Sequence, residues 1–282
     1  MKRAAVILGI LSIAVWAGAQ TAGQTAQQKP AAAGQTAPAA KRPPQAKTDA
    51  ELTAWKAAAA QTDPAALEKA AEDFATKYPD SELRVLLYKT AMRLFQNANN
   101  AEKTEAMGRK VLGFDGDDPE ALAVVAEVIA ERTRDTDIDK DQRLGEAVTL
   151  ARKATQTIDT DISVPAGTPQ DKIDAYKSML RSNAFSTLGA VEYKKENYAA
   201  AQEDLQKAID AYPSDPAPVD VLRLALALDK QQKYTEALKV ANRAVEMTQD
   251  NTPIGTPARR ERDRLQQLTV GLLPEPQTPP KN

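Results

Sequence analysis

The chain has 282 residues, of which 42% are hydrophobic, and its 37 Lys and Arg against 39 Asp and Glu leave a formal net charge of -2. It contains no histidine and no cysteine, which excludes Ser-His-Asp catalysis, thiol nucleophiles, thiolate zinc sites and disulfides. The carboxylates are spread over predicted helix faces without the aromatic-rich cleft sequence that sugar hydrolysis needs. We therefore expect no enzymatic activity and no cofactor.

The first 19 residues have the pattern of a secretory signal peptide. Lys2 and Arg3 open it, an apolar run follows, and Ala17-Gly18-Ala19 offers a small-residue cleavage site. The apolar run is shorter than the roughly 20 residues that a membrane-spanning helix needs, and no cysteine follows it to carry a lipid anchor. We expect cleavage before Gln20 and a periplasmic or secreted protein without a transmembrane segment.

Residues 20–47 form a predicted disordered linker, because they are rich in Ala, Gln and Pro and poor in large apolar side chains. This arm contains no acid and four bases, which are Lys29, Lys41, Arg42 and Lys47. Residues 48–282 carry 31 Lys and Arg against 39 Asp and Glu, a net charge of -8. The acidic body argues against nucleic acid as a partner, while the basic arm leaves open binding to an anionic polymer of the cell wall or envelope.

Helix start signals recur between residues 48 and 269. Thr48 with Glu51 forms a predicted capping box, Asp63-Pro64 is a cap followed by proline in the first turn, and Thr168-Pro169 with Asp171 repeats that pattern. The predicted helices lie near 48–61, 64–78, 81–97, 100–113, 119–134, 143–158, 169–196, 198–211, 216–231, 234–248 and 256–269. Taken in order, they make five hairpins and a terminal capping helix. Residues 270–282 are rich in proline and are expected to be disordered.

One acidic segment is a candidate metal site. Its carboxylates are spaced like the oxygen ligands of an EF-hand calcium loop and are Asp135, Asp137, Asp139, Asp141 and Glu146. However, Lys140 occupies the position where that loop needs glycine, and nearby bases compete for the carboxylates, namely Arg132, Arg134 and Arg143. A solvated acidic loop is the simpler interpretation.

Two stretches repeat one another at an offset of 36 residues, since Tyr198, Ala201 and Ala208 recur as Tyr234, Ala237 and Ala244. A period of this length on helix-forming sequence indicates stacked helical hairpins. The clearest repeats are 182–215 and 216–250. In the first, small residues stand where helices must cross closely and large ones where gaps must be filled; the pattern comprises Phe185, Leu188, Gly189, Tyr193, Tyr198, Ala201, Leu205, Ala208 and Pro213.

This segment resembles the tetratricopeptide repeat (TPR), and the Tyr78-Pro79 and Tyr212-Pro213 junctions resemble those of exported TPR proteins of the bacterial envelope. The resemblance implies an all-α fold, an α-α superhelix of about five hairpins plus the capping helix. It also implies a concave groove lined by the first helix of each hairpin. Carried over by register, the groove residues are Asn183, Ser186, Tyr193, Lys194, Asp220, Leu224, Glu120, Glu127 and Glu131.

The family's clamp for acidic C-terminal peptides needs a set of Lys, Asn and Arg that this chain lacks at those positions. A mildly acidic groove instead favours an extended or helical segment with basic and apolar residues. Our leading hypothesis is an exported, non-enzymatic TPR scaffold that binds a protein or peptide partner in the bacterial cell envelope. The alternatives are a calcium-binding helical module that uses the loop 135–146 and a polymer-binding protein that uses the basic arm.

Overall fold

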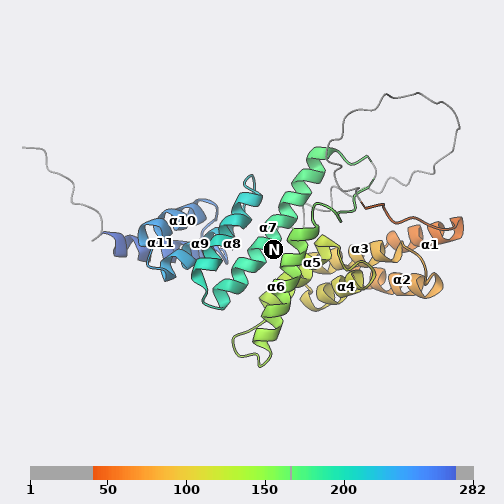
Figure 1. Ribbon diagram of the computed structural model, residues 1–282, viewed down its shortest axis with the longest axis horizontal. Helices are drawn as coiled ribbons and strands as arrows, with labels where there is room; N and C mark the ends of the chain where they lie inside the picture. The colour runs from red at the N-terminus through yellow and green to blue at the C-terminus, as the bar shows by residue number, and fades with distance from the viewer. Residues whose placement is uncertain (1–40, 166, 271–282) are drawn as a thin grey trace, which may run out of the picture. The chain divides into compact units, whose positions relative to one another are not determined.

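The computed structural model describes residues 41–270 except residue 166, and in that part the chain forms helices and no strand (Figure 1). The helices are α1 (Asp49–Ala59), α2 (Pro64–Lys77), α3 (Arg84–Asn97), α4 (Ala101–Phe114), α5 (Pro119–Arg132), α6 (Lys140–Thr157), α7 (Gln170–Lys194), α8 (Tyr198–Ala211), α9 (Pro218–Lys230), α10 (Tyr234–Glu246) and α11 (Gly255–Thr269). Their bounds lie within three residues of the predicted ones. The predicted signal peptide, most of the predicted linker and the tail after Val270 lie outside the described residues.

The described chain divides into two compact units, whereas the sequence was interpreted as one repeat domain from 48 to 269. The first unit contains residues 41–118 and 157–174, and the second contains residues 119–156 and 175–270. In the first unit α3 contacts α1, α2 and α4; in the second α9 contacts α8, α10 and α11. A first helix thus packs on its hairpin partner and also on the first helix of the next hairpin, as α1 does with α3 and α9 with α11. This arrangement confirms the predicted α-α superhelix of hairpins.

Three of the hairpin turns share one backbone geometry. A three-residue link joins α3 to α4, α7 to α8, and α9 to α10, and its middle residue has a positive φ: 55° at Asn99, 62° at Glu196 and 60° at Gln232. The next N–H then donates to a carbonyl five residues earlier, as from Asn197 to Glu192 (2.9 Å) and from Lys233 to Leu228 (3.0 Å). These bonds satisfy carbonyls at the end of the first helix. The 36-residue period is therefore present in the backbone as well as in the sequence.

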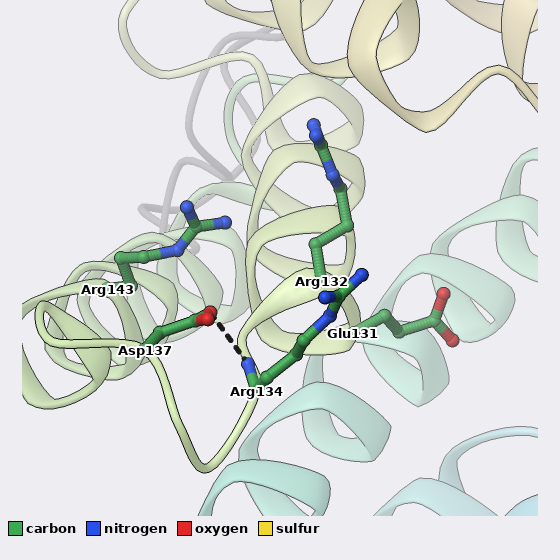
Figure 2. A pocket seen from close by; sticks show the side chains of 5 residues that line it. All are labelled: Glu131, Arg132, Arg134, Asp137 and Arg143. Carbon is green, nitrogen blue, oxygen red and sulfur yellow. Dashed lines mark hydrogen bonds between the residues drawn. The ribbon is translucent and has the colours of Figure 1, made fainter.

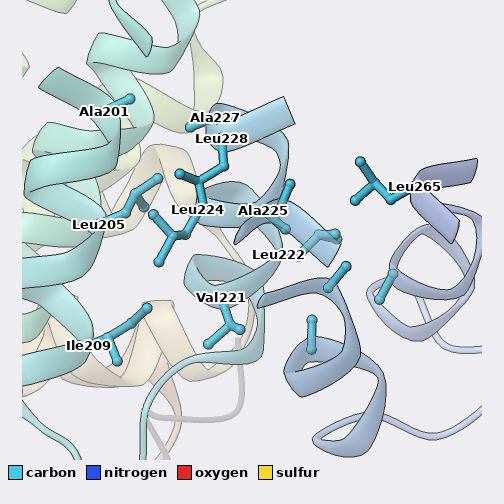
Figure 3. Close-up of a cluster of buried hydrophobic side chains, with 14 residues drawn as sticks. Ala201, Leu205, Ile209, Val221, Leu222, Leu224, Ala225, Ala227, Leu228 and Leu265 are labelled. Atoms are coloured by element: carbon cyan, nitrogen blue, oxygen red, sulfur yellow. The ribbon is translucent and has the colours of Figure 1, made fainter. Parts of the chain in front are cut away.

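One hydrophobic cluster of the second unit is built from α8 to α11 (Figure 3). Leucines of α8 and α9 fill it, and alanines of α8 and α10 occupy the close crossings. The four repeat alanines are fully buried, and they are Ala201, Ala208, Ala237 and Ala244. Among the large repeat residues Leu188 is buried, while Phe185, Tyr198 and Tyr234 are half-buried; Pro213 is exposed just beyond the end of α8.

Gly189 marks the tightest approach of α7 to α8. A Cβ atom at this position would lie 2.6 Å from Cγ of Leu205 and 3.0 Å from its backbone nitrogen. Gly145 on α6 is a helical glycine in the same unit, and a Cβ there would meet nothing within 4 Å. Alanine substitutions at the two positions therefore separate the effect of packing on stability from the effect of helix propensity.

We expect Gly189→Ala to destabilise the protein by about 1–2 kcal/mol, because overpacking costs roughly 1–3 kcal/mol and the gain in helix propensity returns only part of it. Gly145→Ala should instead stabilise it by about 0.5–1 kcal/mol. Urea unfolding of both variants measures the difference. A stabilised Gly189→Ala variant would contradict the close helix crossing.

The helix caps were predicted with one error. The hydroxyl of Thr48 accepts from the Glu51 N–H (3.1 Å), and the side chain of Asp63 accepts from the Ala66 N–H (2.8 Å), as expected. Thr168 was expected to cap α7, but its hydroxyl donates to the carbonyl of Pro165 (2.7 Å). The threonine closes the preceding turn because that carbonyl lies within reach of its short side chain.

The capping box at α1 also ties this helix to the start of α3. Glu51 is only 3% exposed, and its carboxylate accepts from the Lys47 N–H (2.7 Å) and from the Ser81 hydroxyl. Burial by itself would raise the pKa of Glu51, but the hydrogen bonds from Ser81, Lys47 and Thr48 outweigh it and hold the pKa below its usual value. The ionised carboxylate therefore stabilises the first unit.

A group with a lowered pKa in the folded state contributes stability above its unfolded pKa and loses it as the pH falls. We expect Glu51→Gln to cost about 1–3 kcal/mol at pH 7, and the difference from wild type should shrink below about pH 4.5. Urea unfolding at several pH values measures it. Glu203→Gln, which changes an exposed carboxylate on α8, is the control and should leave the wild-type profile almost unaltered; a Glu51→Gln deficit that did not depend on pH would refute the assignment.

Candidate partner-binding face

The predicted groove residues come from α5, α7 and α9, which are linked side by side in the second unit. The Tyr176 hydroxyl on α7 donates to the carboxylate of Glu120 on α5 (2.6 Å). Further along α7, the Ser186 hydroxyl donates to the carboxylate of Asp220 on α9 (2.5 Å). The first helices of three consecutive hairpins are thus connected by hydrogen bonds between their side chains.

These bonds overturn part of the predicted groove. Glu120 is 2% exposed, Asp220 is 1% exposed and Leu224 is 4% exposed. The two carboxylates are buried between helices because hydroxyls of α7 reach them, and Leu224 belongs to the apolar core. None of the three is available to a partner in this structure, contrary to the expectation.

The predicted groove residues of α7 mainly serve the fold. Tyr193 is half-buried, and its ring lies edge-on to Tyr198 with 5.4 Å between centroids; desolvation raises its pKa. Lys194 donates to the backbone carbonyls of Ala130 (2.6 Å) and Thr133 (2.8 Å) at the end of α5. Lys194 therefore caps a helix C-terminus, where a cation is favoured, although desolvation lowers its pKa.

The residues of this region that remain accessible define what we call the α5–α7–α9 face, which consists of Glu127, Glu131, Asn183 and Arg223. Glu131 is exposed and the other three are half-buried. Desolvation and the neighbouring carboxylate of Glu131 raise the pKa of Glu127, and Asp220 acts in the same direction. Arg223, which the sequence interpretation missed, opposes this effect, and its guanidinium lies 3.9 Å from the Asp220 carboxylate. Its position three residues after Asp220 on the same helix was the available signal.

The acidic segment does not bring its carboxylates together. Asp135 pairs with Lys140 (2.8 Å), and the Asp137 carboxylate accepts from the Arg134 N–H (2.8 Å). The helix α6 begins at Lys140, three residues earlier than predicted, so the last two proposed ligands lie on a helix and not in a loop. Within the described ranges no group of three or more acidic side chains is arranged to hold a metal ion.

The end of the basic arm contacts the first unit. Lys41 pairs with Asp115, and the guanidinium of Arg42 lies 2.7 Å from the Glu82 carboxylate. The Gln45 N–H donates to the same carboxylate (3.1 Å), and these bonds lower the pKa of Glu82, that from Arg42 most. Two of the four arm bases therefore neutralise acids of their own chain, while Lys29 lies outside the described residues. Among residues 41–165 and 167–270, every helix is too short or too polar to span a membrane.

The sequence matches no family model and no curated protein. Among solved structures, the MamA protein is similar at 16% identity, with 70% of this chain and 89% of that chain covered and a TM-score of 0.48. TTC0263, a thermophilic TPR protein in Thermus thermophilus, is similar at 13% identity, with 78% of this chain and 99% of that chain covered and a TM-score of 0.43. The assembly chaperone of RpL4, Acl4, is similar at 13% identity, with 79% of this chain and 98% of that chain covered and a TM-score of 0.41. Likenesses at this level assign no partner. The hairpin pairing, the repeated turn and the buried small residues described above are those of stacked helical hairpins, the class of fold that the sequence predicted.

The contribution of the hydrogen bond between Tyr176 of α7 and Glu120 of α5 to stability can be tested directly. Tyr176→Phe removes one donor to the buried Glu120 carboxylate, so we expect a loss of about 1–3 kcal/mol in unfolding free energy. Tyr212→Phe, at the half-buried end of α8, should change it by less than about 0.5 kcal/mol. Urea unfolding of both variants measures the difference, and equal effects would show that the bond to Glu120 is unimportant.

Proposed function

We propose that the protein is an exported, non-enzymatic TPR-type scaffold that binds a protein or peptide partner in the bacterial cell envelope through the α5–α7–α9 face. The observation that carries this proposal is the attachment of the three first helices to one another by hydrogen bonds between their side chains. Because Tyr176 and Ser186 hold them together, their accessible side chains keep fixed positions, and binding requires little ordering of the scaffold. The signal-peptide pattern of residues 1–19 supports export.

The chemistry of the face indicates the kind of partner. Glu127 and Glu131 are one helical turn apart on α5, where like charges repel, and the raised pKa of Glu127 reflects desolvation first and this repulsion second. A Lys or Arg side chain placed between the two carboxylates relieves the repulsion and returns the pKa of Glu127 toward its usual value. The favoured partner is therefore an extended or helical segment with basic residues, accompanied by apolar ones.

The test uses residues 20–282 as bait in an envelope extract, with crosslinking and capture. Glu127→Lys together with Glu131→Lys reverses two charges on the face and should weaken capture of a specific protein by about tenfold or more, which corresponds to 1.4 kcal/mol. The matched control reverses two exposed acids of α8, Glu203→Lys with Asp210→Lys, and should capture as wild type does. Circular dichroism checks that all variants keep their helicity.

If both double variants captured the same amount of the partner protein, the proposed binding face would be contradicted. Export is tested by purifying the natural protein from the envelope fraction of its own cells and measuring its mass. A chain that begins at Gln20 supports cleavage of the signal peptide, and a retained N-terminus contradicts it.

A further inference from the structure

A pocket of about 370 Å³ lies where α5 ends and the loop to α6 begins (Figure 2). Three guanidinium groups and two carboxylates line it, from Glu131, Arg132, Arg134, Asp137 and Arg143. In Figure 2 Glu131 extends away from Arg143, so its carboxylate does not face that guanidinium. The lining has an excess of positive charge although the body of the protein is acidic.

The pocket is held in place by buried groups. Thr133 is 3% exposed; its hydroxyl donates to the Ile129 carbonyl (2.7 Å) and accepts from Nε of Arg143 (3.1 Å). The Thr133 hydroxyl thus orients the Arg143 side chain through Nε, and this bond does not use the two terminal nitrogens of the guanidinium. A guanidinium held in this way loses little conformational entropy when it binds a ligand.

The backbone around the pocket is equally constrained. The Asp137 carboxylate accepts from the Arg134 N–H (2.8 Å) and fixes the turn after α5. The Lys194 ammonium binds the carbonyls of Ala130 and Thr133, which counters the negative end of the α5 dipole. The C-terminus of a helix normally repels anions, and here that repulsion is offset.

The two guanidiniums have unused donors. Within residues 41–165 and 167–270, neither Arg134 nor Arg143 forms an ion pair through its side chain. The lining carboxylate of Asp137 accepts a hydrogen bond from the backbone N–H of Arg134. A guanidinium presents paired N–H groups that match the two oxygens of a carboxylate or a phosphate.

We propose that this arginine pocket binds an oxyanionic group, a carboxylate or a phosphate, through the terminal N–H groups of Arg134 and Arg143. The proposal does not rest on the α5–α7–α9 face, because it needs no protein partner and the anion contacts Arg134 and Arg143, which are not part of that face; Glu131 is the residue that the two share. Glu131 lies at the edge of the pocket and lowers its affinity for anions. The bound group neutralises the excess positive charge of the lining.

The experiment follows the arginine Nε–Hε signals of ¹⁵N-labelled residues 20–282 by NMR. Sodium phosphate or disodium glutarate replaces sodium chloride at constant ionic strength. We expect saturable shifts of the Arg134 and Arg143 signals with a millimolar Kd, and Glu131→Gln should tighten binding about two- to threefold by removing a repulsive charge. A response to phosphate alone identifies a phosphoryl ligand, and a tighter response to glutarate identifies a carboxylate.

Arg134→Gln alone and together with Arg143→Gln should weaken the binding at least tenfold, measured on the remaining backbone signals of the pocket. The matched control is Arg152→Gln with Arg243→Gln, which removes two exposed arginines of the same unit and should bind as wild type does. The exposed position of Arg134 makes its single variant a test that does not depend on the Thr133 bond. Shifts that do not saturate with either anion, or that persist in the pocket variants, would overturn the proposal.

Discussion

Buried polar bonds between the first helices of successive hairpins are the constraint on which the rest of the structure depends. Glu120 accepts from Tyr176, and Asp220 accepts from Ser186. In the first unit, the Lys89 ammonium lies 2.6 Å from the Asp118 carboxylate, and both side chains are buried. A buried carboxylate without a donor is costly, so these pairs disfavour any other alignment of the helices.

This constraint explains why the surface available for binding is smaller than the repeat pattern implies. The first helices provide many polar residues, but those nearest the next hairpin are used to hold it. Further along α5, Glu127 is half-buried and Glu131 is exposed, and each carboxylate lies in the field of the other. The same division separates a buried, hydrogen-bonded carboxylate, Glu120, from the more accessible Glu127 and Glu131 along a single helix, α5.

The end of α5 shows how one helix terminus can serve several purposes. Its carbonyls are bound by Lys194, its last buried hydroxyl orients Arg143, and the turn that follows is fixed by Asp137. The segment that the sequence presented as a calcium loop is thus dominated by its bases. Two of its carboxylates are already engaged, that of Asp135 with Lys140 and that of Asp137 with a backbone N–H.

The sequence by itself determined the class of fold, the helix bounds and the repeat period, because proline, caps and small residues act over a few neighbouring positions. Gly189 and the repeat alanines could be recognised for the same reason: close helix crossings admit only small side chains. The roles of Glu120, Asp220 and Lys194 were decided only by the tertiary structure. Glu120 and Tyr176 are 56 residues apart in the chain, and whether a carboxylate at the start of a helix faces solvent or a hydroxyl depends on which distant helix packs against it.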